Sequence, residues 1–268
     1  MLKLRIILKE YLLLFYSLVT LYIMARLGNK KNFKGLVGNV VFREQDGMQI
    51  VQSRATNVKQ SKATKSCATE FGNCSKWAKQ LRIGLTPFLL GMTDNTMHQR
   101  LTTAIYSRIK GTTGMEIGTR TPFTVWMEPM GRFEYNLNSP FENYFRPNIY
   151  STLNAAHEVT VLINDFVVDT DVTFPLGCST ADLVILIQAT TLEEGYTPLE
   201  LYITIPVNKG TVLPEDIEWV TEPMPPHHLI TVSAKLYYYN LNTFSGRNYL
   251  NTKTFSPAQM ILIDTTHV

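Results

Sequence analysis

The residues that could do chemistry are spread along the chain without the spacing that a metal site needs. His227 and His228 are adjacent, and adjacent side chains on an extended strand point to opposite faces, so the pair is poorly placed to hold one ion. Asp165, Asp169 and Asp171 supply oxygen ligands of the kind that calcium prefers, but they lack EF-hand spacing. We therefore predict no metal ion and no cofactor.

Catalytic groups show the same lack of pattern. Ser179, His157 and Asp182 could be combined into a nucleophile, a base and an orienting acid, but no G-x-S-x-G elbow surrounds a serine. The glycines fit neither a phosphate loop nor a dinucleotide fingerprint. The sequence thus favours a non-catalytic structural or interaction protein.

Charge is the strongest functional signal. The net charge of the 268-residue chain is only +3, yet residues 26–82 carry twelve Lys and Arg against three acidic residues, and residues 111–268 carry seven basic against seventeen acidic residues. Such asymmetry favours self-association between complementary regions, or another protein partner, or binding of a polyanion such as nucleic acid through residues 26–82. The candidate contact residues are Lys30, Lys31, Lys34, Lys59, Lys62, Lys65, Lys76, Lys79 and Arg82, with Phe33 and Trp77 available for stacking on bases.

Residues 1–23 form a hydrophobic N-terminal segment with three alternative readings. Basic residues precede an apolar run over residues 11–25, as in a signal anchor, but the run is shorter than the roughly twenty residues that a membrane span needs. It is a membrane anchor, an added helix, or the product of a start assigned too far upstream. A start at Met24 predicts a cytoplasmic protein, whereas translation of residues 1–23 predicts a membrane-tethered binding module.

Two helices are predicted between residues 65 and 110. The first carries an apolar stripe and should end or kink at Pro87, which lacks an N–H. The second begins after Thr93, Asp94 and Asn95, and Thr96 and Gln99 have capping-box spacing. The two stripes consist of Cys67, Phe71, Cys74, Ala78, Leu81, Leu85 and Phe88, and then of Met97, Leu101, Ile105 and Ile109.

The three cysteines do not form a disulfide framework. Cys67 and Cys74 lie seven residues apart on one predicted helix, roughly 10 Å by the helical rise, which is too far for a bond between them. With Cys178 they are predicted to be reduced, buried thiols.

A β-hairpin is predicted before the helices. Two β-rich runs, Val37–Phe42 and Met48–Gln52, flank the turn signal Asp46-Gly47. From there the order of motifs resembles a family of uncharacterised Bacteroidetes proteins with a G-x-x-G…DG hairpin, an EFG…AKxLRxxLxP helix and an MxxRL helix. The resemblance covers residues 24–110 and implies a fold and a start at Met24 but no activity. Its motif residues here include Gly38, Gly47, Phe71, Gly72, Leu81, Arg82, Pro87, Arg100 and Leu101.

From residue 111 onward the chain reads as an acidic β domain. The expected fold class is α+β, mainly β, with the basic β-hairpin and helical hairpin of residues 24–110 followed by an antiparallel immunoglobulin-like sandwich. Leu183–Ile187 is apolar on both faces and should be central, Thr231–Tyr239 should have one core face and one amphipathic face, and Thr211–His228 reads as a crossing loop. The predicted strands are Phe123–Met127, Arg132–Asn136, Glu158–Val168, Leu183–Thr190, Leu199–Val207, Leu229–Asn240 and Gln259–Asp264.

Overall fold

The computed structural model describes residues 23–27, 33–45, 47–54, 59–211 and 216–266. The chain divides into two compact units, Met1–Ser61 and Lys62–Val268. The boundary therefore precedes the helices, whereas the sequence placed it after residue 110. The physical reason is that the helices bury their apolar stripes against the C-terminal sheet, which makes them part of the second unit.

The described part of the first unit is an antiparallel sheet in the order β1-β2-β3-β4. The predicted hairpin pairing is confirmed, because Gln45 pairs with Met48; Asp46 of the predicted turn lies outside the described residues. The predicted strand before it is divided in two by a turn at Gly38, whose φ of +57° favours glycine. The strands are β1 (Ile23–Leu27), β2 (Phe33–Val37), β3 (Val40–Gln45) and β4 (Met48–Ser53). Residues 23–25 of the predicted anchor thus lie in β1, and residues 1–22 lie outside the described residues.

Both predicted helices are present as α2 (Lys62–Leu89) and α3 (Met97–Gly111). Their stripes are buried as expected, with two exceptions: Cys67 is half-buried, and Phe71 is 49% exposed and packs edge-on against Tyr106. Pro87 lies in the last turn of α2, which ends two residues later. Within the described residues, no helix combines the length and the apolarity needed to cross a membrane.

The start of α3 differs from the predicted capping box. The Thr96 side chain caps no backbone N–H. The Asp94 carboxylate does so instead, accepting from the Thr96 N–H at 2.8 Å and from the Leu137 N–H at 3.2 Å. It also accepts from the Thr96 hydroxyl at 2.6 Å and pairs with Arg100. These donors favour the ionised form and lower the pKa of Asp94 to about 2 against the opposing effect of burial.

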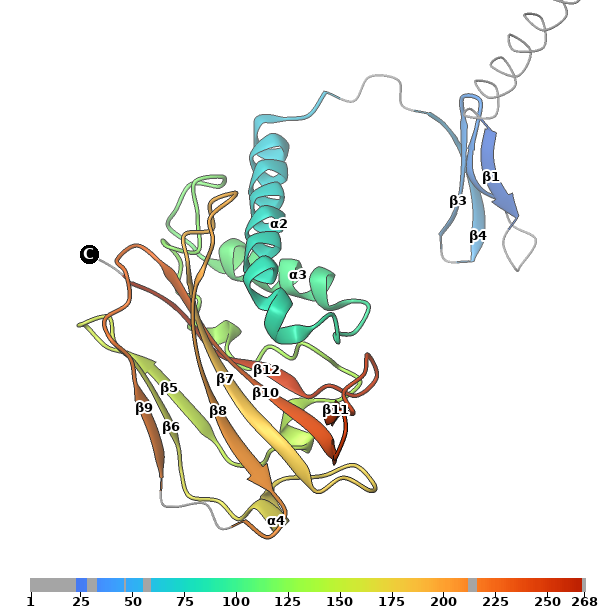
Figure 1. Ribbon diagram of the computed structural model, residues 1–268. Helices are drawn as coiled ribbons and strands as arrows, with labels where there is room; N and C mark the ends of the chain where they lie inside the picture. Colours follow the sequence, from blue (N-terminus) through green and yellow to red (C-terminus); the bar gives the residue numbers. More distant parts are fainter. Residues whose placement is uncertain (1–22, 28–32, 46, 55–58, 212–215, 267–268) are drawn as a thin grey trace, which may run out of the picture. The chain divides into compact units, whose positions relative to one another are not determined.

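The second unit is α+β, mainly β, and its strands pair antiparallel (Figure 1). A five-stranded sheet has the order β11-β10-β7-β8, with β12 also pairing along β10, and a three-stranded sheet has the order β5-β6-β9. The strands are β5 (Ile149–Leu153), β6 (Val159–Ile163), β7 (Thr180–Thr190), β8 (Leu199–Asn208), β9 (Ile217–Val220), β10 (Leu229–Asn242), β11 (Gly246–Tyr249) and β12 (Ala258–Thr265). Short helical turns are η1 (Glu128–Met130), η2 (Phe141–Asn143) and α4 (Val168–Asp171).

The five-stranded sheet is covered on both faces. One face shares a core with the three-stranded sheet, in which Val161 of β6 packs with Leu183 of β7 and Val232 of β10. The other face packs under α2 and α3, where Leu186 and Met260 join the helical stripes. β7 is central, as predicted, because it pairs with β10 on one side and β8 on the other.

Several strand predictions were wrong, and each concerns weakly paired sequence. Phe123–Met127 forms turns. Arg132–Asn136 forms no regular strand, although Glu134 bridges Gln259 and its neighbours share main-chain hydrogen bonds with Ala258 and Met260 of β12. Glu158–Val168 contains the five-residue β6 followed by the start of α4. The short strands β5, β9 and β11 were not predicted. β9 lies in Thr211–His228, which was predicted to be a crossing loop.

The predicted amphipathic face of β10 is buried. Thr231, Ser233 and Lys235 have no exposed surface, because α2 and α3 lie over them. The sequence pattern of one strand does not reveal what covers its polar side. Here a helical layer takes the place of solvent. Ser233 and Lys235 find hydrogen-bond partners inside the protein, in the Tyr135 hydroxyl and the carbonyls at the end of α2, whereas Thr231 Oγ1 has none among the described residues.

Gly84 is the point of closest approach between α2 and the sheet. A Cβ there would lie 1.9 Å from Gln188 Nε2 and 2.9 Å from Pro198 Cγ. We expect Gly84→Ala to lower the free energy of unfolding by about 1–3 kcal/mol through overpacking. Gly72→Ala on the same helix, where a Cβ meets nothing within 4 Å, should instead stabilise by about 0.5–1 kcal/mol. Urea unfolding of both variants checks this.

The double variant Gly84→Ala/Gln188→Ala sharpens that comparison. Shortening Gln188 removes the atoms that the new methyl group meets first, so the effect of Gly84→Ala should shrink markedly in this background. An undiminished effect would place the close contact elsewhere.

Candidate interaction surface

Four of the predicted contact residues lie along one face of α2. By the 100° advance per residue, Lys62, Lys65, Lys76 and Lys79 fall within an arc of about 100°, opposite the buried stripe, over a length of about 25 Å. All four are exposed. We call this set the lysine row. It can hold extended negative charge because the helix supplies no exposed carboxylate beside it: its single acidic residue, Glu70, is buried.

The lysine row is largely without partners. Lys79 contacts Glu194 at 3.7 Å, and both side chains are largely exposed. The other three lysines form no ion pair with any residue that the structure describes. Lys62 and Lys65 also stand in the first turn of α2, where the helix dipole disfavours cations and where the helix has no acidic residue. This end of α2 is therefore strongly positive.

The remaining predicted contact residues lie elsewhere. Lys34 belongs to the first unit and pairs with Glu44 at 2.9 Å. Lys59 is exposed ahead of α2. Arg82 is half-buried and donates from Nε to the Ala78 carbonyl at 3.3 Å, so it lies off the row. Lys30 and Lys31 lie outside the described residues. The structure thus groups four of the nine predicted residues. Trp77, offered for stacking, is half-buried.

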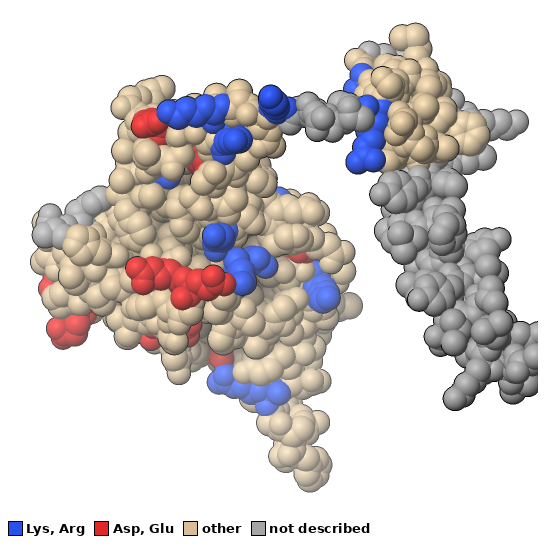
Figure 2. Space-filling model, turned by 90° about the horizontal axis from the view of Figure 1, so that it is seen from above, with Lys and Arg blue, Asp and Glu red and all other residues tan. Residues whose placement is uncertain are grey.

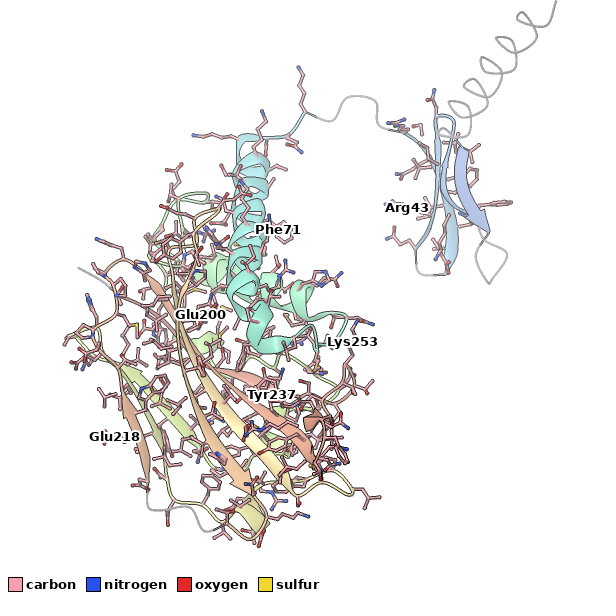
Figure 3. The ribbon with its side chains drawn as sticks, viewed as in Figure 1. Arg43, Phe71, Glu200, Glu218, Tyr237 and Lys253 are labelled. Carbon is pink, nitrogen blue, oxygen red and sulfur yellow. The ribbon has the colours of Figure 1, made fainter. Side chains whose placement is uncertain are left out.

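Acidic side chains gather at the α4 end of the second unit. Asp165, Asp169, Asp216 and Glu218 are exposed there, and we call them the acidic end. Asp216 Oδ1 accepts from the Asp165 N–H at 2.9 Å, which brings the β6–α4 connection against the start of β9. Figure 3 shows Glu218 on the outer side of β9. In Figure 1, α4 and α2 lie at opposite ends of the unit.

Figure 2 shows the opposite end, seen from above. Lys and Arg side chains gather on this face of the second unit, with a group of Asp and Glu side chains beside them. The two signs therefore occur next to each other on this face, in keeping with the contact between Lys79 and Glu194.

A buried ion pair holds the chain after α3 against α2. Arg120 donates from Nε and Nη2 to the two carboxylate oxygens of Glu70, both at 2.7 Å. Arg120 Nη1 also donates to the carbonyls of Lys110 and Thr112 at the end of α3. The Arg120 guanidinium lowers the pKa of Glu70 against the effect of burial. Sequence reasoning missed this pair, because its members are fifty residues apart.

A buried lysine closes the other helix. Lys235 Nζ donates to the carbonyls of Phe88 and Leu89 at 3.0 and 3.1 Å, at the end of α2, and lies 4.2 Å from the centre of the Tyr237 ring. Burial lowers the pKa of Lys235 to about 7. Tyr237, labelled in Figure 3, also donates to the Phe88 carbonyl. The site stabilises a helix end and presents no reactive amine to solvent.

A small hollow lies between the edge strands β5 and β12. Its volume is about 250 Å³, and Phe141, Phe145, Gln259 and two arginines line it. Behind it, the Glu134 carboxylate accepts from the Phe141 N–H at 3.0 Å and from Gln259 Nε2 at 2.7 Å. Burial nevertheless raises the pKa of Glu134 to about 7. The hollow is below the 300–1,000 Å³ typical of ligand pockets.

The residues weighed for chemistry are not assembled into a site. Asp182 binds Arg247 rather than a histidine, and His157 lies in the turn between β5 and β6. His228 contacts the Tyr196 hydroxyl at 2.8 Å. Among the described residues, no group of three His, Cys, Asp or Glu side chains could hold a metal ion. The cysteines are free: Cys74 and Cys178 are buried and Cys67 is half-buried.

The residues of the family resemblance have mainly structural positions. Gly38 and Gly47 adopt positive φ in turns, and Leu81 and Leu101 are buried in the helical layer. Arg100 donates to the Glu134 carbonyl at 2.9 Å, whereas Gly72 lies on an open side of α2. They mainly position the helices on the sheet, and Pro87 also lines a hollow of about 350 Å³ between α2 and the start of β8.

Comparison with known proteins gives no relative. No protein-family model, no curated protein and no solved structure matches the chain. The resemblance to the Bacteroidetes family stays a prediction.

Proposed function

We propose that this protein is a non-catalytic interaction protein that self-associates through contacts between its basic and acidic regions. The observation that carries the proposal is the lysine row, an exposed face of α2 on which Lys62, Lys65 and Lys76 pair with no described carboxylate. A second copy could neutralise it with its acidic end, which offers four exposed carboxylates. Complementary surfaces of this kind guide association and set its specificity.

The positions of the two surfaces define the type of assembly. The lysine row and the acidic end lie toward opposite ends of the second unit (Figure 1). A contact between different surfaces of two copies leaves one free surface of each kind, so it continues into a ring or an open chain. We therefore propose assembly beyond a dimer at low ionic strength.

We also propose a fold for the second unit that keeps these two surfaces apart. The five-stranded and three-stranded antiparallel sheets share one core, which supports an immunoglobulin-like sandwich with a helical hairpin added on its outer face. Such a framework would hold the row and the acidic end rigidly apart.

Light scattering after size-exclusion chromatography of the full chain tests the proposal. We expect large species at low salt that dissociate as salt screens the exposed charges. Reversing the row with Lys62→Glu, Lys65→Glu and Lys76→Glu should abolish them, and so should Asp165→Lys, Asp169→Lys and Glu218→Lys at the acidic end. Glu116→Lys, Glu128→Lys and Glu222→Lys, three exposed residues elsewhere, form the matched control and should assemble normally.

Mixing the two charge-reversed proteins distinguishes a contact between these surfaces from a general charge effect. Each variant alone presents like charges at both surfaces. Together, each supplies the partner that the other lacks, so assembly should return in the mixture. Assembly that is unaffected by salt and by both reversals would overturn the proposal.

Nucleic acid is the second candidate partner, because the lysine row is a line of positive charges along one helix face. A helix face with four lysines over about 25 Å can follow a phosphate backbone. If it does, affinity for duplex DNA should fall with salt with a log–log slope of roughly −3 to −4. The row-reversed variant should lose this binding, and the variant reversed at the acidic end should keep it.

A further inference from the structure

Among the residues that the structure describes, no strand pairs with the outer edge of β8. β8 pairs with β7 on one side and is the last strand of the sheet order on the other. Lys209, just beyond the strand, donates its N–H to the Ser179 carbonyl, so by antiparallel alternation the odd-numbered residues of β8 bond to β7. The N–H and C=O groups of Glu200, Tyr202 and Thr204 therefore point away from the sheet. Figure 3 shows Glu200 at this margin, beside α2.

The sequence of this edge is nearly symmetric about Tyr202. Pro198 and Pro206 stand four residues on either side of it. Between them, Leu199 corresponds to Ile205, Leu201 to Ile203, and Glu200 to Thr204. The prolines lack an N–H, which suits the two ends of a short ladder. A strand that is symmetric in this way is complementary to itself when two copies run antiparallel.

We propose that β8 pairs with β8 of a second copy, antiparallel and centred on Tyr202, so that the five-stranded sheets of two protomers join into one. In this register Tyr202 faces its own counterpart, and Glu200 faces Thr204 of the other copy. The outward groups then form about six inter-strand hydrogen bonds. On the opposite face Leu201 meets Ile203. A contact of this kind is isologous and closes as a dimer.

Other registers of the β8–β8 pair are less favourable, because they bring like charges together or leave hydrogen-bond acceptors without donors. Centring on Glu200 would place two carboxylates opposite each other, which destabilises a strand pair. Centring one residue to either side of Tyr202 would set an outward residue opposite Pro198 or Pro206 and leave a hydrogen-bond acceptor without its donor. Only the Tyr202 register pairs every outward N–H and every outward C=O between the two prolines.

The proposed occupant is a second copy, because the self-complementary sequence lies in the chain itself. Tyr202 is 70% exposed, and Glu200 and Thr204 beside it are also exposed. The three side chains are therefore accessible to a second copy. Glu200 is the only charged residue of β8. The pairing goes beyond the electrostatic contact proposed above and stands without it, because main-chain hydrogen bonds and apolar pairs persist at salt that screens surface charges.

The test is the mass of the full chain in solution at moderate salt, where the contact between opposite charges is screened. We expect light scattering to give twice the protomer mass of 30.5 kDa. Tyr202→Lys and Tyr202→Glu should each give the protomer mass, because the axis sets like charges face to face. An equimolar mixture of the two should recover the dimer through opposite charges at the axis.

Controls separate this contact from others. Tyr150→Lys makes the same change on β5 at a side chain that is 50% exposed, and it should remain dimeric. Thermal melting should show that every variant is folded. A wild-type protomer mass at all concentrations, a dimer that survives Tyr202→Lys, or a mixture that stays monomeric would each overturn the proposed pairing. Loss of the larger low-salt species in the charge-reversed variants, with the dimer intact, would leave it standing.

Discussion

Arg120→Met is expected to lower the free energy of unfolding by about 3–5 kcal/mol, because it leaves the buried carboxylate of Glu70 without its partner. Glu70 is 1% exposed and Arg120 is 6% exposed. The guanidinium also donates to the carbonyls of Lys110 and Thr112, so the substitution removes the donor of one carboxylate and two carbonyls at once. Urea unfolding at pH 7 followed by circular dichroism measures the change.

The matched control is Arg132→Met, the same substitution in an exposed Arg–Glu pair. Arg132 contacts Glu142 at 3.3 Å with both side chains largely exposed, and such pairs contribute about 1 kcal/mol or less. The double variant Glu70→Leu/Arg120→Met removes the stranded charge and should recover part of the loss. Equal effects for Arg120 and Arg132 would show that the buried pair is not the stronger of the two.

Stability is expected to rise with pH between about 7 and 9, through Lys235. Burial lowers its pKa in the folded protein from 10.5 to about 7. Over this interval the unfolded chain holds the proton that the folded protein releases, so raising the pH favours folding. The slope of about 1.4 kcal/mol per pH unit gives a gain of about 2–3 kcal/mol. Below pH 7 both states are protonated, and the penalty for burying the ammonium is present in full.

Lys235→Met provides the comparison. Methionine cannot titrate, so the variant should show a nearly flat stability over the same pH interval, whatever its stability at pH 7. Unfolding free energies from urea titrations at pH 7, 8 and 9 measure both proteins. A wild-type stability that is flat or falls over this range would contradict the assignment, as would the same rise in the variant.

The elements with strong, long patterns were predictable. Both helical stripes and the central strand β7 follow from periodicity, because residues that share a face must share an environment. The packing of the helices on the sheet could not be predicted from periodicity. The pattern of β10 shows polar residues such as Ser233 and Lys235 on one face, but only tertiary contacts reveal that α2 and α3 cover that face.

The elements that escaped prediction are short or irregular. β9 and β11 have four residues each, too few for an alternating pattern to stand out. The segment between α3 and β5 is irregular and is held by contacts with distant residues, such as the bridge from Glu134 to Gln259 and the hydrogen bond from the Tyr135 N–H to the Ala258 carbonyl. Such contacts depend on residues more than one hundred positions away, and no local propensity signals them.

The candidate surface was predictable only in composition. The lysines were identified from charge, but their alignment depends on α2 running without a break from Lys62 through Lys79. The predicted helix began three residues later, which left Lys62 outside it. The partners Glu70 and Arg120 gave no local signal, because neither lies in a motif.

The capping of both helix ends by buried cations determines how the second unit comes apart. Arg120 holds the last carbonyls of α3, and Lys235 holds those of α2. Detaching the helical hairpin would strip the Lys235 ammonium of its acceptors inside an apolar layer. The hairpin and the sheet should therefore open together as one cooperative unit, with amides near Phe88 exchanging their hydrogens as slowly as those of β10.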